Sequence, residues 1–92
     1  MTTVITQLAI AGKTTMVETE GNFEATANWM KLLADKVEIK YNVRFSQWGH
    51  SFTFEVNLNV DEYYEIEFWG NCKCEIRKYD RNTWEMCQST EL

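Results

Sequence analysis

Two cysteines two positions apart, Cys72 and Cys74, are the most conspicuous candidates for chemistry in this sequence. A structural zinc site needs four ligands, usually from CxxC-type turns and histidines. Only Cys87 and His50 remain to complete such a site, and strand alternation places Cys87 on the face opposite the pair. Free cysteine commonly packs as a small buried hydrophobe. The sequence therefore predicts core cysteines, with no metal and no cofactor.

His50, the only histidine, could act as a general base only beside a nucleophile or an orienting partner. Ser46 and Ser51 are near it in the sequence, but neither lies in a GxSxG nucleophile turn. The chain also contains no phosphate-binding glycine loop, no dinucleotide fingerprint and no HExxH motif. We therefore expect no catalytic residues and a protein that is not an enzyme.

The charge balance favours a protein partner over nucleic acid. Fourteen acidic and nine basic residues give a net charge of −5. Affinity for nucleic acid depends on Lys and Arg that neutralise phosphates, so direct nucleic-acid binding is not expected. An acidic surface instead favours approach to basic partners, which include the channels of nucleic-acid enzymes.

Length and cysteine usage indicate one intracellular domain. Ninety-two residues suit a single domain spanning residues 1–92. An odd cysteine count at irregular spacing indicates a reducing compartment. The N-terminus lacks the features of a signal peptide, and no stretch approaches the roughly 20 apolar residues of a membrane span. We expect a cytoplasmic protein with no membrane partner.

The first half of the chain is predicted to contain a hairpin and one helix. Residues 3–10 are rich in β-formers and alternate between two faces, and Ala11-Gly12 offers a tight reversal into residues 13–20. From Phe23 the apolar residues recur every three or four positions, which predicts an amphipathic helix over about residues 23–40.

The helix also carries end signals. Asn22 is its expected N-cap, and Asn42 marks its expected end because asparagine tolerates the left-handed conformation that closes helices.

The second half returns to a period of two, which predicts an antiparallel meander with a short strand over residues 43–48 and a longer one over 52–60. Opposed residues in an antiparallel pair share a face. Pairing Leu58 with Ile66, Phe68 with Cys72 and Cys74 with Met86 satisfies this condition. The predicted inward residues are Phe52, Phe54, Val56, Leu58, Val60, Tyr64, Ile66, Phe68, Cys72, Cys74, Ile76, Trp84 and Met86. The predicted fold is α+β: an N-terminal β-hairpin, one amphipathic helix and a β-meander packed on that helix.

This register would align glutamates on the outward face, with Glu65 opposite Glu75 and Glu75 opposite Glu85. Like charges opposed in a sheet destabilise it by about 0.2–1 kcal/mol each. Lys73 and Arg77 could screen them, which would make this an ordinary solvated face. Alternatively, the row is an acidic platform for a basic partner. The predicted partner-binding glutamates are Glu65, Glu67, Glu75 and Glu85.

Outward aromatic residues are the second candidate surface. Trp69, Tyr63, Tyr79 and Trp48 are expected on or beside the solvent face. Aromatics on a sheet can stack nucleobases, although single-strand binders combine them with a basic groove. They are also enriched at protein–protein hot spots, and they can simply cover sheet edges. We add Trp69 and Tyr79 to the predicted partner-binding residues.

The acidic meander from Asn57 to Glu85, with the helix from Phe23 to Lys40, resembles anti-CRISPR proteins encoded by phages. Those inhibitors include small, acidic, proline-poor chains with one helix on an antiparallel sheet. The resemblance implies a stoichiometric inhibitor in the host cytosol that docks on the basic nucleic-acid path of a CRISPR effector and blocks target DNA binding. Lys73, Arg77 and Lys78 depart from a pure nucleic-acid mimic because they interrupt the negative field.

Two other function classes stay open. The protein could be a self-associating structural module whose sheet edge pairs with a second copy to form a homodimer. It could also be a small nucleic-acid-binding domain that uses the aromatic sheet. Concentration-dependent mass would identify the first class, and steep salt dependence of binding would identify the second.

Overall fold

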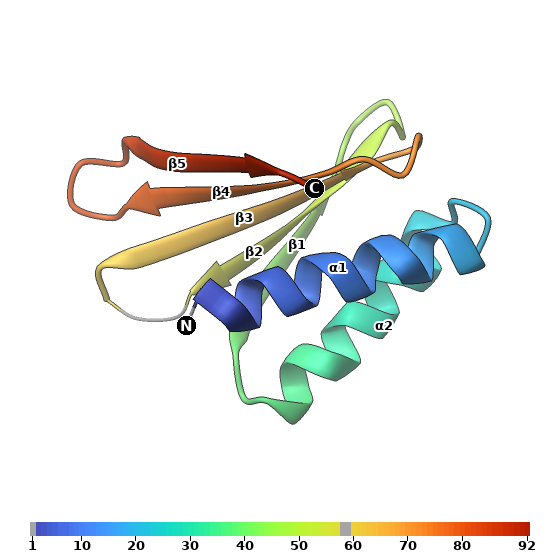
Figure 1. Ribbon diagram of the computed structural model, residues 1–92, viewed down its shortest axis with the longest axis horizontal. Coiled ribbons are helices and arrows are strands. Elements are labelled where there is room, and N and C mark those ends of the chain that lie inside the picture. Colours follow the sequence, from blue (N-terminus) through green and yellow to red (C-terminus); the bar gives the residue numbers. More distant parts are fainter. Residues whose placement is uncertain (1, 58–59) are drawn as a thin grey trace.

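The computed structural model describes residues 2–57 and 60–92 and shows two helices followed by an antiparallel five-stranded sheet (Figure 1). The strands follow one another across the sheet in chain order, β1-β2-β3-β4-β5. No helix in the described ranges is long and apolar enough to cross a membrane. The elements are α1 (Thr2–Glu18), α2 (Phe23–Lys36), β1 (Lys40–Phe45), β2 (Ser51–Asn57), β3 (Glu62–Trp69), β4 (Cys74–Asp80) and β5 (Met86–Glu91).

The α+β class agrees with the sequence, but the predicted N-terminal hairpin and single helix are wrong. The segment assigned to the hairpin forms α1. Its buried residues Ile5, Leu8, Ala9 and Met16 follow helical spacing along one face. The β-branched residues of the segment gave it an apparent period of two. Burial against the rest of the protein overrides that preference.

Gly12 lies in the middle of α1 rather than in the predicted reversal. A Cβ atom at this position would be 2.7 Å from Cζ of Phe68 and 2.8 Å from Sδ of Met30. Only a residue without a side chain allows α1 to approach β3 and α2 so closely. Glycine inside a helix costs about 0.5–1 kcal/mol relative to alanine, and the close packing offsets this.

The start of α2 agrees with the prediction, because Oδ1 of Asn22 accepts a hydrogen bond from the Ala25 N–H at 3.0 Å. Its end does not, since α2 stops at Lys36 instead of about residue 40. Glu38 has a φ of 57°, and the Ile39 N–H donates to the Ala34 carbonyl at 3.0 Å. These are features of a Schellman motif.

The turn after α1 has the same construction. Glu20 has a φ of 57°, and the Gly21 N–H donates to the Met16 carbonyl at 2.8 Å. Both helices therefore end with a glutamate in the left-handed conformation.

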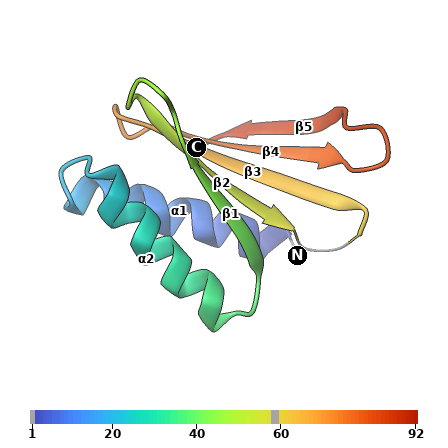
Figure 2. The same cartoon turned by 180° about the vertical axis from the view of Figure 1, so that it is seen from behind.

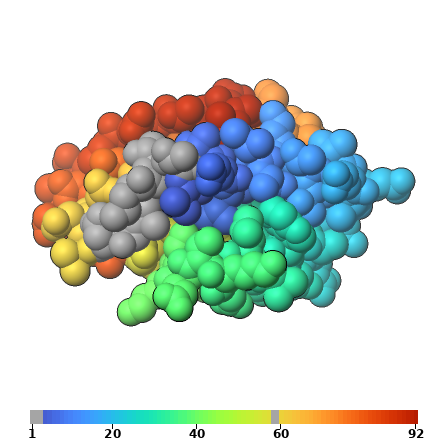
Figure 3. All heavy atoms as spheres, turned by 60° about the horizontal axis from the view of Figure 1, so that its bottom comes forward, coloured from blue at the N-terminus to red at the C-terminus, as the bar shows by residue number. Residues whose placement is uncertain are grey.

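The helices lie side by side on one face of the sheet, α1 over β3 and β4 and α2 over β1 and β2 (Figure 2). Among the described residues neither helix packs on β5, which runs beyond α1 at the rim of the helical side (Figure 3). The core is formed between the layers, where Phe52 stacks on Phe68 with ring centroids 4.9 Å apart. Phe23 of α2 packs edge-on against Phe52.

The observed register keeps the predicted apolar face but shifts the pairing of β2 with β3. Ile66 lies opposite Phe54, not Leu58. Leu58 and Asn59 themselves lie outside the described residues. Val60 was predicted to point inward, yet it is 80% exposed in the turn after β2.

The other two hairpins are also shifted. Phe68 lies opposite Cys74 rather than Cys72, which sits in the turn with a φ of 63°. Met86 lies opposite Tyr79 next to a register irregularity, not opposite Cys74, and it is exposed rather than inward. The shifts of β2 against β3 and of β3 against β4 are even, so they preserve which side chains share a face, and alternation alone did not fix these registers. The irregularity between Lys78 and Tyr79 makes the shift at Met86 odd, which moves Met86 to the other face.

We expect Gly12→Ala to lower the free energy of unfolding by about 1–3 kcal/mol through overpacking, although alanine is the better helix former. Chemical denaturation measures the change. Gly70→Ala is the control, because a Cβ there meets only Cζ of Phe23 at 3.8 Å. Unchanged or increased stability of Gly12→Ala would contradict the close approach.

Candidate protein-binding surface

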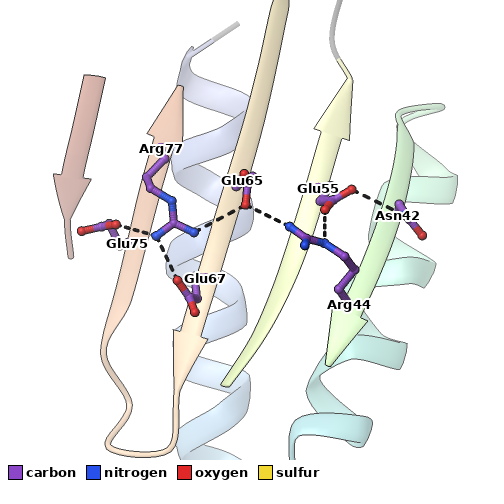
Figure 4. A network of polar contacts seen from close by, with 7 residues as sticks. All are labelled: Asn42, Arg44, Glu55, Glu65, Glu67, Glu75 and Arg77. Atoms are coloured by element: carbon purple, nitrogen blue, oxygen red, sulfur yellow. Dashed lines mark hydrogen bonds and ion pairs between the residues drawn. The ribbon is translucent and has the colours of Figure 1, made fainter. Parts of the chain in front are cut away.

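The face of the sheet that points away from the helices, here called the outer face, carries a connected set of polar side chains (Figure 4). Four carboxylates and two arginines from four neighbouring strands form the centre of this set. We call it the charged network: Asn42, Arg44, Glu55, Glu65, Glu67, Glu75 and Arg77.

Within the charged network, the register places like charges directly opposite each other. Glu55 lies opposite Glu65, and Glu67 lies opposite Glu75. The predicted opposition of Glu65 with Glu75 is wrong, because Glu65 faces Arg77. Without cations nearby, each like-charge pair would destabilise the sheet.

Arg77 neutralises three of these carboxylates at once. Its guanidinium lies 2.6 Å from Glu75, 2.9 Å from Glu67 and 3.5 Å from Glu65, and its side chain is only 15% exposed. Partial burial acts to lower the pKa of Arg77. Its hydrogen bonds to Glu75 and Glu67 outweigh burial and raise the pKa.

Arg44 extends the network to the edge strand β1. It forms ion pairs with Glu55 and, at 3.2 Å, with Glu65. Asn42 donates to Glu55 at 3.4 Å. Glu65 thus bridges both arginines. The network keeps four carboxylates against two guanidinium groups, which leaves a surplus of negative charge at the centre of the outer face.

Three of the four predicted glutamates meet in this network, but Glu85 does not. Glu85 precedes β5 and is exposed, and Glu91 instead occupies the position opposite Glu75. Glu91 forms an exposed ion pair with Lys73 at 3.9 Å. The predicted row across three strands is therefore replaced by a more compact cluster on β2, β3 and β4.

An aromatic cluster of Tyr63, Tyr79 and Trp84 borders the network at one end of the outer face. The ring centroid of Tyr63 lies 6.0 Å from that of Tyr79 and 5.9 Å from that of Trp84. The guanidinium carbon of Arg81 lies 5.7 Å from the Tyr63 centroid. Partial burial and then a hydrogen bond to Glu55 raise the pKa of Tyr63, so the phenol stays protonated.

The two predicted aromatic site residues are separated along the sheet. Tyr79 belongs to the aromatic cluster, whereas Trp69 lies at the other end of β3, opposite Ser51. Alternation predicted Trp84 in the core, but β5 begins only at Met86, so the alternation does not extend to position 84. Trp84 precedes that strand and is 64% exposed. The turn-forming residues Asp80 and Asn82 are the sequence feature that indicates a longer loop between β4 and β5.

The residues considered for chemistry are dispersed. Cys74 is buried, Cys72 is half-buried in its turn and Cys87 is exposed. Over residues 2–57 and 60–92, no three His, Cys, Asp or Glu side chains gather as a metal site would require. Ser46 has a structural role, since its Oγ accepts hydrogen bonds from the backbone N–H groups of His50 and Ser51 at 2.9 Å and 3.2 Å.

We expect Arg77→Ala to lower the free energy of unfolding by about 1–3 kcal/mol, because Glu67 and Glu75 lose their hydrogen-bond donor and Glu65 keeps only its pair with Arg44. Denaturant titration measures this loss. Lys73→Ala removes an exposed ion pair and should change stability by less than about 1 kcal/mol. If both variants are equally stable, the network does not support the sheet.

The thiols should differ sharply in reactivity. Burial raises the pKa of Cys74 to about 12, so its thiolate is scarce at pH 8, and we expect iodoacetamide to alkylate Cys87 but not Cys74 in the folded protein. Mass spectrometry of the digested protein measures this difference. Equal alkylation of both residues in the absence of denaturant would contradict the burial of Cys74.

The same burial predicts a pH dependence of stability. Above the ordinary pKa of 9.0, the unfolded chain loses the Cys74 proton while the folded chain retains it up to about pH 12. The free energy of unfolding contributed by this group should therefore fall as the pH rises between these values. Comparing the melting temperature of Cys74→Ala with that of the original chain at pH 8 and pH 10.5 isolates this contribution.

A scan against models of known protein families, a search of curated proteins and a search of solved structures each find no match to this chain. Its function must therefore be inferred from its own contacts, charges and exposed side chains.

Proposed function

We propose that this protein is a non-enzymatic binding protein that docks its outer face on a basic surface of a protein partner. The observation that carries the proposal is the charged network, in which four carboxylates outnumber two arginines on a sheet face that neither of the described helices covers. A basic partner would meet a negative field at the centre of this face.

The fixed geometry of the network supports a specific protein partner. Glu55 and Glu65 are each 13% exposed, and Glu67 is 21% exposed, so their carboxylates are held by neighbours rather than freely solvated. Binding to ordered side chains loses less conformational entropy than binding to mobile ones. The surplus of negative charge also opposes direct binding of nucleic acid through this face.

The resemblance to anti-CRISPR inhibitors gives the proposal a defined form. In that form, the partner is a CRISPR effector complex in the host cytosol, and the outer face covers the positively charged path that holds the guide and the target DNA. Arg44, with a 59% exposed side chain, places a positive charge at the β1 edge of the same face. The face is therefore not a uniformly negative mimic of nucleic acid, and it suits a basic protein surface that also carries an acidic group near the β1 edge.

A second candidate function, self-association, is favoured by β5. Each of its six residues is exposed, and it pairs only with β4. Edge strands are commonly protected from further pairing by Lys, Pro or other charged residues. In β5 the one charged residue is Glu91, which is ion-paired with Lys73. Mass measured by light scattering between micromolar and millimolar concentration tests this alternative.

We expect Glu67→Gln combined with Glu75→Gln to weaken inhibition while preserving the fold, because glutamine still accepts hydrogen bonds from Arg77. Loss of two charges that face a basic partner should raise the inhibitory concentration by roughly tenfold or more, since about 1.4 kcal/mol corresponds to a factor of ten. The assay measures target DNA binding by a guide-loaded CRISPR surveillance complex in a gel shift.

The matched control is Glu18→Gln with Glu24→Gln, which removes the same charge from the helical layer. We expect this pair to inhibit like the original protein. Equal weakening by both pairs would show that net charge, not the outer face, matters. If the original protein leaves DNA binding by the complex unchanged, this complex is not its target.

A further inference from the structure

The aromatic cluster lies where the turn after β2 and the turn after β4 meet, since the Arg81 N–H donates to the Asp61 carbonyl at 3.2 Å. Two of its three rings are partly buried against the sheet. The third, Trp84, exposes 64% of its surface. Tryptophan, tyrosine and arginine are the residue types that dominate the energetics of protein interfaces.

The backbone holds Trp84 in an unfavourable conformation. Its φ is 57°, a value that is uncommon for any residue with a side chain and a true outlier for a bulky one. The Trp84 N–H donates to the Asp80 carbonyl at 2.6 Å, and the Tyr63 ring contacts the indole. Glycine or asparagine would fit this turn with less strain. Backbone strain of this kind is concentrated at functional sites, which makes the exposed indole a candidate for binding.

The charges around the cluster favour a cation. Asp80 and Glu85 flank the loop that carries Trp84, and the Asp80 N–H donates to the Glu85 carbonyl at 3.1 Å. The fold already contains the interaction in question, because the guanidinium of Arg81 lies over the Tyr63 ring. The exposed Trp84 ring, which contacts Tyr63, offers a second aromatic surface of the same kind. It lies in the loop between Asp80, whose Oδ1 accepts a hydrogen bond from the Asn82 N–H at 2.8 Å, and Glu85.

We propose that the aromatic cluster is a binding site for an arginine side chain of the protein partner. The guanidinium stacks on Trp84 and is neutralised by Asp80 and Glu85. Arginine suits the site better than lysine, because its planar and weakly hydrated guanidinium stacks on aromatic rings while also pairing with carboxylates. The inference rests on the proposed function, since it names the side chain through which a basic partner is recognised.

The test uses two short peptides, hexa-arginine and hexa-lysine, titrated into the ¹⁵N-labelled protein at low salt. We expect hexa-arginine to shift the indole N–H signal of Trp84 and to bind roughly three- to tenfold more tightly than hexa-lysine. The indole of Trp48, which is 76% exposed at the tip of the β1–β2 turn, is the internal control and should shift far less.

Two variants complete the test. Trp84→Asn keeps a residue that tolerates a positive φ, so the fold should survive, and it should reduce hexa-arginine affinity to the level of hexa-lysine. Trp48→Ala should bind both peptides like the original protein. If Trp84→Asn has a much lower melting temperature, the shift of the Trp84 indole N–H signal in the original protein still shows whether hexa-arginine binds at this ring.

The outcomes separate this inference from the proposed function. Equal affinity for both peptides, with no Trp84 shift, would overturn the arginine site and leave the acidic docking face in place. Failure of both peptides to bind would contradict both. A Trp84 shift caused by hexathymidine instead of hexa-arginine would make the cluster a nucleobase-stacking surface, and the arginine site would be rejected.

Discussion

The close contact of α1 with the sheet at Gly12 is the constraint on which the rest of the structure depends. Phe68 and Met30 occupy the space where any side chain at this position would lie. Because of this contact, α1 and α2 can both cover the apolar face of one sheet. The helices pack on β1 to β4 from one side only, and charged side chains occupy the opposite face.

The charged network also has a role in specifying the register. Shifting β4 by two residues against β3 would keep the apolar residues on one face. It would, however, place Glu65 opposite Glu75 and move Arg77 away from its position opposite Glu65. That register would still oppose two glutamates, but Arg77 would lose the central position from which it contacts three carboxylates. Alternation of apolar residues selects the face, and the arginines help to select the alignment within it.

Apolar alternation selects the face but not the register, and this difference explains how much of the structure the sequence could predict. The start of α2 at Asn22 and the inward faces of β2 and β3 follow from short-range patterns, and both are confirmed. The helical nature of α1 was missed because its β-branched residues also alternate. The registers of β2 with β3 and of β3 with β4 were missed because even shifts are equivalent for apolar patterning, and the pairing of β5 was missed because of the irregularity between Lys78 and Tyr79. Alternation predicted that Glu65, Glu67 and Glu75 share the outward face, whereas the exposure of Trp84 could be predicted only from the loop before β5.

The glutamates that end both helices have a consequence for engineering this fold. Glu20 and Glu38 adopt left-handed backbone conformations that glycine would adopt without a steric penalty. For an L-residue with a side chain, that conformation costs roughly 1–2 kcal/mol. The free energy of unfolding is therefore lower than it could be with glycine at these two exposed positions, which lie far from the outer face. Thermostabilised versions could be obtained there by substitution to glycine without altering the sheet, at the expense of part of the acidic character of the surface.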